Sequence, residues 1–231
     1  MIEAISVNPR PTMYKTVKRL MDIFIAALAL LLLLPILLPV VIILAFTGEK
    51  EIFYFQKRIG YLNKPFNIYK FATMLKNSPN IGTGEITLRN DPRVTPFGKF
   101  LRMSKINELP QIINVLKGDM SIVGPRPLMQ VSFDLYSPQV QANIYKSRPG
   151  ITGIGSVVFR DEEKIVSESE DPQHTYRNII YPYKGQLELW YLENASLLTD
   201  CKIIFLTAWS ILFPQNKLVN TFFTNLPPRN F

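Results

Sequence analysis

A run of 24 residues without charge, Asn or Gln, from Ile23 to Phe46, constrains the fold of this chain more than any other feature. Apolar runs of about 18 residues or more are long enough to cross a bilayer as a helix. Pro35 and Pro39 lie inside the run, and each proline removes a backbone hydrogen bond and bends a helix. The run therefore predicts a proline-broken membrane helix.

The residues that flank this run leave two topologies open. Because Lys/Arg-rich flanks stay in the cytoplasm, a re-entrant helix, whose two ends lie on the same face, fits a chain that is basic on both sides. A single spanning helix also fits, since mid-membrane prolines are tolerated in spanning helices. The basic flanking residues are Lys15, Lys18 and Arg19 before the run and Lys50, Lys57 and Arg58 after it.

The net charge and the small number of His and Cys residues limit which partners and which metal ions the protein can bind. The net charge is +8, and residues 47–105 hold most of the excess, with 11 Lys or Arg against 4 Asp or Glu. Such an excess beside a membrane segment favours anionic headgroups or a phosphorylated substrate. No nucleic-acid motif accompanies it, so we expect no nucleic-acid partner. One His and one Cys are too few for a structural zinc site or a disulfide, so any metal should be a hard cation such as Mg²⁺.

Turn residues and hydrophobic periodicity predict an α+β fold that is mostly helical. Two strands are expected at residues 52–56 and 66–74, joined by a turn around Gly60 and Asn63. Residues 77–96 and the charged stretch 160–171 are interpreted as loops. Apolar residues at helical spacing predict helices at 107–117, 137–146, 184–193 and 200–213. The last of these is expected either in the core or on the membrane surface.

Three short segments carry residues suited to binding anions. The helix expected from residue 107 presents Asn107 and Glu108 at its N-terminus, where free N–H groups and the helix dipole attract anions. Arg126 lies on a Gly-Pro-Arg-Pro turn, and Arg148 begins an Arg-Pro-Gly turn. Arg forms forked hydrogen bonds to phosphate or carboxylate. For either arginine taken singly, a structural ion pair is the commoner role.

The order of the motifs along the chain is more specific than any one motif. They are Lys18-Arg19 with Asp22, Phe55-Gln56-Lys57-Arg58-Ile59-Gly60, Lys70-Phe71-Ala72-Thr73-Met74, Asp91-Pro92-Arg93-Val94-Thr95, Glu108-Leu109-Pro110-Gln111, Asn114 to Ser121, Gly124 to Pro127, and Arg148 to Gly153. This ordered set, over roughly residues 14–213, resembles the bacterial sugar transferase family, the monotopic polyprenol-phosphate phosphoglycosyl transferases.

The resemblance implies an enzyme that transfers a sugar-1-phosphate from a UDP-sugar to undecaprenyl (polyprenol) phosphate, releases UMP and requires Mg²⁺. It implies the first membrane step of surface glycan, capsule or exopolysaccharide assembly, among membrane lipids at the cytoplasmic face of the bacterial inner membrane. Residues 1–48 would form an N-terminal tail and a re-entrant membrane helix. Residues 49–231 would form a cytoplasmic catalytic domain with surface-lying amphipathic helices. The family breaks its helix at a Ser-Pro pair, which Leu34-Pro35 replaces here.

One substitution separates this chain from the family's mechanism. The family's nucleophile is the Asp of an Asp-Glu pair, which forms a phospho-enzyme intermediate, and Asn107 replaces it here. A neutral amide is not a usable nucleophile. Three interpretations of Asn107 remain: a natural substitution, an engineered change, or a protein that binds without catalysing. Asn and Asp are about equally good helix N-caps, so a role as N-cap is compatible with all three. Ala72 in place of a basic residue and Glu188 in place of an Asp favour a natural variant.

The motif residues define a predicted site. We expect Glu108 to bind Mg²⁺, with Glu188 as a possible second acidic group, and basic residues to offset phosphate charge. The catalytic set is Glu108, Asn107 and Glu188, and the phosphate- and nucleotide-binding set is Arg126, Arg148, Arg93 and Lys70. Either Glu108 or the polyprenol phosphate attacks, and we favour direct attack by the lipid phosphate.

An alternative function from a different class is a catalytically impaired or non-catalytic membrane-bound scaffold that binds the nucleotide sugar. Asn107 motivates this alternative, and release of UMP separates the two. We expect sugar specificity to reside in residues 77–90 and 156–183. His174 is interpreted as a solvated surface side chain, and Cys201 as a small buried residue in a late helix.

Overall fold

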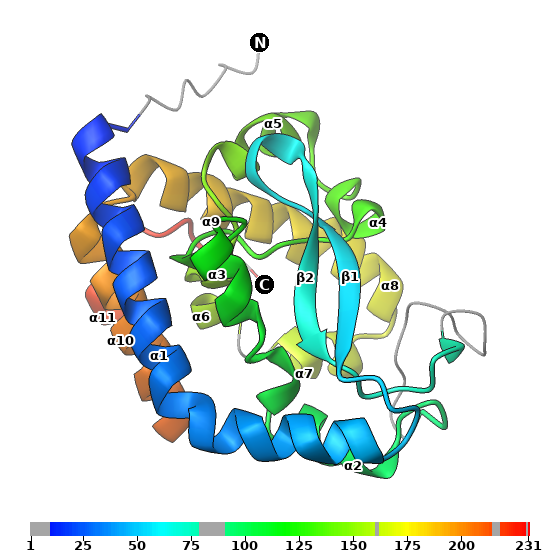
Figure 1. The fold of residues 1–231 in the computed structure, drawn as a ribbon. Helices are drawn as coiled ribbons and strands as arrows, with labels where there is room; N and C mark the ends of the chain where they lie inside the picture. The colour runs from blue at the N-terminus through cyan, green and yellow to red at the C-terminus, as the bar shows by residue number, and fades with distance from the viewer. Residues whose placement is uncertain (1–9, 79–90, 160–161, 214–217, 230) are drawn as a thin grey trace. The chain divides into compact units, whose positions relative to one another are not determined.

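The computed structural model describes residues 10–78, 91–159, 162–213, 218–229 and 231. These residues are mostly helical and include two small sheets (Figure 1), which confirms the predicted α+β fold. The strands are β1 (Phe53–Ile59), β2 (Pro65–Phe71), β3 (Ser121–Val123) and β4 (Gly150–Thr152). The α-helices are α1 (Thr12–Phe46), α2 (Pro96–Met103), α3 (Gln111–Lys117), α4 (Gln130–Phe133), α5 (Pro138–Asn143), α6 (Ile154–Val158), α7 (Glu162–Glu168), α8 (Pro172–Thr175), α9 (Tyr181–Asn194), α10 (Leu197–Leu212) and α11 (Leu218–Phe222). Short 3₁₀ turns are η1 (Tyr61–Asn63), η3 (Ile106–Glu108) and η4 (Ile144–Lys146), and η5 (Tyr176–Ile180) is a π-helical turn.

The chain divides into two compact units, and each is described by itself. The first unit comprises residues 1–22, 58–66 and 118–231, and the second comprises residues 23–57 and 67–117. The helix α1 and the strands β1 and β2 contribute residues to both units. The predicted site residues are divided between them: Arg126, Arg148 and Glu188 belong to the first unit, and Lys70, Arg93, Asn107 and Glu108 to the second.

The predicted membrane segment forms one helix. α1 is 35 residues long, contains Pro35 and Pro39, and bends part-way along its length (Figure 1), as mid-helix prolines require. Within the described ranges it is the helix that is long and apolar enough to cross a membrane. Large apolar side chains along it are exposed, including Phe46, which is 81% exposed. An apolar surface of this kind is typical of contact with lipid or another apolar partner.

One face of the later part of α1 packs inside the second unit. Leu37, Val40 and Leu44 are buried in the same apolar cluster as Phe71 of β2 and Leu101 of α2. Leu44 lies in the last turn of α1. The far end of the apolar helix is therefore part of the core that also holds the hairpin strand and α2.

The β1–β2 hairpin follows the prediction in both strands and in its turn. Leu62 and Asn63 in η1 have left-handed backbone conformations, with φ of 56° and 58°, which close the turn. In the second unit, the Asn114 side chain of α3 forms hydrogen bonds to the backbone of β2, as a neighbouring strand would. Its Nδ2 donates to the carbonyl oxygen of Asn67 (2.8 Å), and its Oδ1 accepts the Tyr69 N–H (2.9 Å). The amide thus satisfies two backbone groups of β2.

The predicted helix over residues 107–117 is wrong at its start. The helix α3 begins at Gln111, and Asn107 lies in the separate 3₁₀ turn η3, whose N-cap is Lys105 in a left-handed conformation (φ 60°). Pro110 has no N–H, and its ring would clash with a preceding helical turn, so the α-helix begins only after it. Asn107 is therefore not a helix N-cap, and the helix-dipole argument for an anion site at Asn107 and Glu108 falls with it.

The first unit is built around α9. One side of this helix contributes Leu187 and Tyr191 to a core shared with α6 and α10, and another contributes Leu189 and Leu192 to a second core shared with α5 and η4. The predicted helices at 137–146, 184–193 and 200–213 are confirmed as α5 with η4, α9 and α10. β3 and β4 pair in parallel, with Ser121 opposite Gly150.

Two other expectations need correction. Part of the charged stretch 160–171 is the helix α7, because Ile165 and Val166 give it an apolar face that packs on the core; residues 160 and 161 lie outside the described residues. Cys201 is exposed on α10 rather than buried. His174 is exposed, as expected.

Candidate active site

Two Gly/Pro turns that are distant in the sequence lie backbone to backbone in the first unit. The Gly124 N–H donates to the Thr152 carbonyl oxygen (2.9 Å), and the Gly150 N–H donates to that of Pro125 (2.8 Å). A Cβ on Gly124 would lie 2.3 Å from the Arg148 carbonyl oxygen, and one on Gly150 would lie 2.2 Å from the Gly124 nitrogen. Only glycine permits such a close approach of two backbones. The parallel β3–β4 pair thus fixes the Arg126 turn against the Arg148 turn.

Arg126 and Arg148 differ in what surrounds them. Arg126 is exposed, although Pro125 and Pro127 on either side are buried. Arg148 is half-buried: its Nε donates to the Gly118 carbonyl oxygen (2.8 Å), and its guanidinium carbon lies 5.2 Å from the centroid of the Tyr61 ring. Arg126 therefore offers a guanidinium to solvent, whereas Arg148 holds neighbouring backbone and aromatic groups together.

Glu188 is buried beneath the Arg126 turn. It is 4% exposed, and its carboxyl accepts a hydrogen bond from the Arg126 backbone N–H. Its Oε2 has no hydrogen-bond partner among the described residues. Burial raises the pKa of Glu188 to about 8, against the opposing effects of the Lys184 charge and the Arg126 N–H. The carboxyl is therefore largely protonated at neutral pH.

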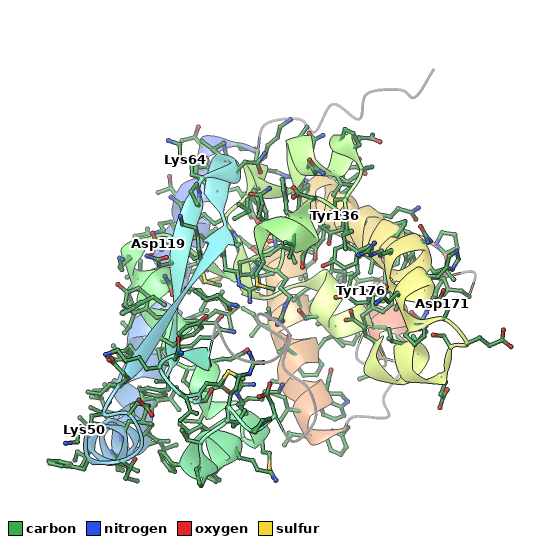
Figure 2. The ribbon with its side chains drawn as sticks, turned by 90° about the vertical axis from the view of Figure 1, so that its right-hand side faces the viewer. Lys50, Lys64, Asp119, Tyr136, Asp171 and Tyr176 are labelled. Carbon is green, nitrogen blue, oxygen red and sulfur yellow. The ribbon has the colours of Figure 1, made fainter. Side chains whose placement is uncertain are left out.

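Tyr136 and Tyr145 lie within electrostatic range of this buried carboxyl in the first unit. Tyr136 and Tyr176, both labelled in Figure 2, pack against Tyr181 with ring centroids 5.2 and 5.0 Å away. The pKa of Tyr136 is raised, first by burial and then by the charge of Glu188. Tyr136 therefore belongs both to this aromatic cluster and to the electrostatic surroundings of Glu188.

The second unit brings together three charged side chains. The Lys70 Nζ lies 3.5 Å from Glu108 Oε1, with the two side chains 17% and 36% exposed. Arg102 of α2 donates from its Nε to Thr73 Oγ1 (2.8 Å). Burial lowers the pKa of Arg102, and the charge of Glu108 is among the effects that raise it, which puts the two groups within electrostatic range. The sequence analysis missed Arg102; its one signal was membership of the basic block 47–105.

Asn107 carries an unsatisfied acceptor directly beside Glu108. Its Oδ1 is buried and has no hydrogen-bond partner among the described residues. Leaving such a group unpaired costs on the order of 1–3 kcal/mol, so each instance in a folded protein calls for an explanation. A ligand or cation that meets this oxygen would supply the missing partner.

Arg93 is engaged inside the second unit. Its Nε and Nη2 contact the two carboxylate oxygens of Asp91 at 2.9 and 2.6 Å, and its Nη1 donates to the Ser78 carbonyl oxygen (2.9 Å). The Arg93 side chain is 3% exposed. This geometry argues against the predicted phosphate contact and gives Arg93 a structural role. Of the segment expected to carry sugar specificity, residues 79–90 lie outside the described residues.

The oxygen donors near Asn107 fit Mg²⁺ in a limited way. No group of three or more His, Cys, Asp or Glu side chains able to hold a metal lies within the described part of the chain. However, Mg²⁺ commonly binds one or two carboxylates together with substrate phosphates and water. The Glu108 carboxylate and the unpartnered Asn107 Oδ1 are hard oxygen donors of that kind. Glu188 fits less well, because a metal ligand must be deprotonated.

Comparison with known proteins identifies the family. The family model described as "Bacterial sugar transferase" matches residues 13–214. The chain is 34% identical to the UDP-N-acetylgalactosamine-undecaprenyl-phosphate N-acetylgalactosaminephosphotransferase of Aeromonas hydrophila, over 90% of this chain and 46% of that protein. It is 33% identical to the exopolysaccharide production protein ExoY of Sinorhizobium fredii, over 82% of this chain and 83% of that protein. It is 36% identical to the UDP-glucose:undecaprenyl-phosphate glucose-1-phosphate transferase of Klebsiella pneumoniae, over 83% of this chain and 39% of that protein. These names give no support to the non-catalytic alternative, and the chain belongs to the bacterial sugar transferase family.

Proposed function

We propose that this chain transfers a sugar-1-phosphate from a UDP-sugar to undecaprenyl phosphate and releases UMP, which initiates the assembly of a surface polysaccharide. The observation that carries the proposal is the Lys70–Glu108 pair beside Asn107, within the residues that match the bacterial sugar transferase family. The names of the Aeromonas hydrophila and Klebsiella pneumoniae relatives support undecaprenyl phosphate as the acceptor.

The reaction exchanges one phosphorus–oxygen bond for another. An oxygen of the undecaprenyl phosphate attacks the phosphorus that carries the sugar. The bond from that phosphorus to the bridging oxygen of the diphosphate breaks, and UMP leaves with the electron pair. The product is a sugar joined to the lipid through a diphosphate. Charge on the transferring phosphoryl oxygens is what the protein has to stabilise.

Side chains of each unit are proposed to bind phosphate oxygens or Mg²⁺. The exposed guanidinium of Arg126 would bind phosphate oxygens through forked hydrogen bonds. Lys70 would place its ammonium near the diphosphate, and the Glu108 carboxylate, with the Asn107 Oδ1, would bind Mg²⁺. Bound there, Mg²⁺ would neutralise part of the diphosphate charge.

Asn107 makes direct attack by the lipid phosphate the preferred route, because an amide cannot form the family's phospho-enzyme intermediate. The competing route uses Glu108 as a replacement nucleophile. Incubation with labelled UMP and unlabelled UDP-sugar, without lipid, distinguishes them. Direct attack predicts that no label enters the UDP-sugar, and exchange of label would contradict it.

The experiment that tests the function itself is UMP release. Purified protein with undecaprenyl phosphate, Mg²⁺ and a panel of UDP-sugars should release UMP with at least one sugar, and the variant Glu108→Gln should release far less. The matched control is Glu193→Gln, an exposed carboxylate on α9. Retained UDP-sugar binding without UMP release from any sugar would overturn the transferase proposal and favour the scaffold.

We further propose that α1 is re-entrant and holds the protein at the cytoplasmic face of the inner membrane. Leu37, Val40 and Leu44 pack with Phe71 and Leu101. Because the last turn of α1 is part of this core, the end of the helix must lie on the same side of the bilayer as the core. Single cysteines at Lys15 and Lys50 in a Cys201→Ser background test this. Both should react with a membrane-impermeant maleimide only after the cells are opened, and labelling of one in intact spheroplasts would contradict the topology.

A further inference from the structure

One buried hydroxyl bonds to the backbone on both sides of Pro127 in the Arg126 turn. The Tyr145 hydroxyl donates to the carbonyl oxygen of Arg126 (2.8 Å) and accepts the N–H of Leu128 (3.0 Å). Tyr145 is 1% exposed, and burial raises the pKa of its phenol, which therefore stays in the form that can donate. One side chain thus bridges both sides of the Arg126-Pro127-Leu128 segment.

The other backbone groups of the Arg126-Pro127-Leu128 segment also have hydrogen-bond partners. The Arg126 N–H donates to the Glu188 carboxyl, and the Leu128 carbonyl oxygen accepts the N–H of Ile59 (2.8 Å). The Pro127 carbonyl oxygen accepts a longer contact from Arg58 Nη1 (3.4 Å). Every backbone donor and acceptor from Arg126 to Leu128 therefore has a partner, whereas the Arg126 side chain is exposed.

We propose that Tyr145 is a positioning residue, which acts through the backbone of Arg126 to fix the guanidinium where it meets the substrate diphosphate. The inference rests on the proposed transferase function. A guanidinium binds phosphate well only when its backbone is held, because a displacement of about 1 Å at a binding group can cost on the order of 100-fold in rate. Since the hydroxyl contacts both peptide groups beside Pro127, its loss frees the turn without removing any substrate contact.

The substitution Tyr145→Phe isolates the hydroxyl. The ring stacks on Phe133 with centroids 5.8 Å apart, and Phe preserves that packing. Tyr183→Phe is the matched control, because the Tyr183 hydroxyl donates to the Pro227 carbonyl oxygen (2.9 Å) in the same unit and does not contact the turn. Both variants lose a hydrogen bond from a buried tyrosine to a backbone carbonyl, and Tyr145→Phe also loses the acceptor of the Leu128 N–H.

The measurements are kcat and KM for UMP release, the melting temperature, and hydrogen–deuterium exchange of the peptide spanning the Arg126 turn. Tyr145→Phe should lower kcat/KM by about 10- to 100-fold and speed exchange in this peptide, and both variants should melt at a lower temperature than wild type because each loses a hydrogen bond. Tyr183→Phe should change neither kcat/KM nor exchange in the turn. In an Arg126→Gln background, Tyr145→Phe should cause no further loss, because it acts through Arg126.

The outcomes that overturn the inference are distinct from those that overturn the function. Equal kinetics in Tyr145→Phe and Tyr183→Phe, or full additivity of Tyr145→Phe with Arg126→Gln, would show that the hydroxyl is structural only. If the wild-type protein releases no UMP, the transferase proposal fails. Hydrogen–deuterium exchange then tests, without any activity, whether the Tyr145 hydroxyl holds the Arg126 backbone. Unchanged exchange in the turn of Tyr145→Phe would show that the hydroxyl does not hold the Arg126 backbone.

Discussion

The Nζ of Lys18, near the start of α1, lies 2.8 Å from the Oδ2 of Asp200 on α10, and this joins the N-terminal part of α1 to the body of the first unit. Asp200 is fully buried and also accepts hydrogen bonds from the hydroxyls of Tyr14 (3.1 Å) and Tyr191 (2.8 Å). The carboxylate therefore organises one cation and two phenols in a region with little access to water.

Removing this carboxylate should strongly destabilise the fold. Asp200→Ala leaves a nearly buried ammonium and two hydroxyls without their acceptor, and breaking a buried ion pair by removing one partner costs about 3–5 kcal/mol. The measurement is thermal unfolding of the detergent-solubilised protein. Glu51→Ala is the control, because the Lys76–Glu51 pair (2.7 Å) is exposed and its loss should not shift the melting temperature measurably. Equal melting temperatures for the two variants would refute the role of Asp200.

Glu188 predicts a pH dependence of stability with a definite sign. Its pKa rises from about 4.3 in an unfolded chain to about 8 in the folded protein, so the folded state holds the proton more tightly. This contribution to the free energy of unfolding is complete below the unfolded pKa and is lost as the pH rises through the folded pKa. The groups that act electrostatically with Glu188 are Lys184, which opposes the shift, and the phenols of Tyr136 and Tyr145.

Replacing Glu188 by the neutral Gln should remove that dependence. Relative to wild type, the melting temperature of Glu188→Gln should increase from pH 5 to pH 9, because the variant has no buried charge to form at high pH. Glu193→Gln, on an exposed position of the same helix, should follow the wild-type curve. A constant difference between Glu188→Gln and wild type across this pH range would contradict a raised pKa.

Features encoded by local pattern could be predicted from the sequence. The apolar run with Pro35 and Pro39, the hairpin turn at Asn63, and the helices α9 and α10 follow from hydrophobic periodicity and turn residues. The prediction of where α3 starts was wrong, because the apolar pattern continues across Pro110 whereas the α-helical backbone begins only after it. The helix α7 was missed because its many charges outweighed the two apolar residues that pack it.

The site depends on contacts that no local pattern encodes. Arg126 and Arg148 both belong to Gly/Pro turns in the sequence. Only the fold distinguishes them, since Arg126 is exposed whereas Arg148 donates to the Gly118 carbonyl oxygen. Tyr145 was not selected, because a hydroxyl that bonds to a backbone leaves no periodic signal. Arg93 shows the opposite case: its partner Asp91 is only two residues away, so a motif position is also a local ion pair.

The contrast between Arg126 and Arg93 gives a third prediction. Arg126→Lys should lower kcat/KM for UMP release by about 10-fold or more, because an ammonium cannot form the forked contact to phosphate, and should leave the melting temperature unchanged. Arg93→Lys should lower the melting temperature, because Lys cannot make the paired contacts to Asp91 and Ser78 together. An Arg93→Lys variant that loses turnover without losing stability would restore the phosphate role predicted from the sequence.

Asn107→Asp should introduce the covalent route that Asn107 prevents. The two side chains have nearly the same shape: Asp keeps an oxygen at the buried Oδ1 position and replaces the amide nitrogen by a second oxygen, which makes the group a carboxylate that can attack phosphorus. The variant should therefore exchange label between UMP and UDP-sugar in the absence of lipid, whereas wild type and Asn107→Ala should not. Asn107→Ala is the matched control, since it removes the amide without adding a nucleophile. Exchange in both wild type and Asn107→Ala would identify a nucleophile other than residue 107, with Glu108 the first to examine, and the direct-attack mechanism would then be wrong.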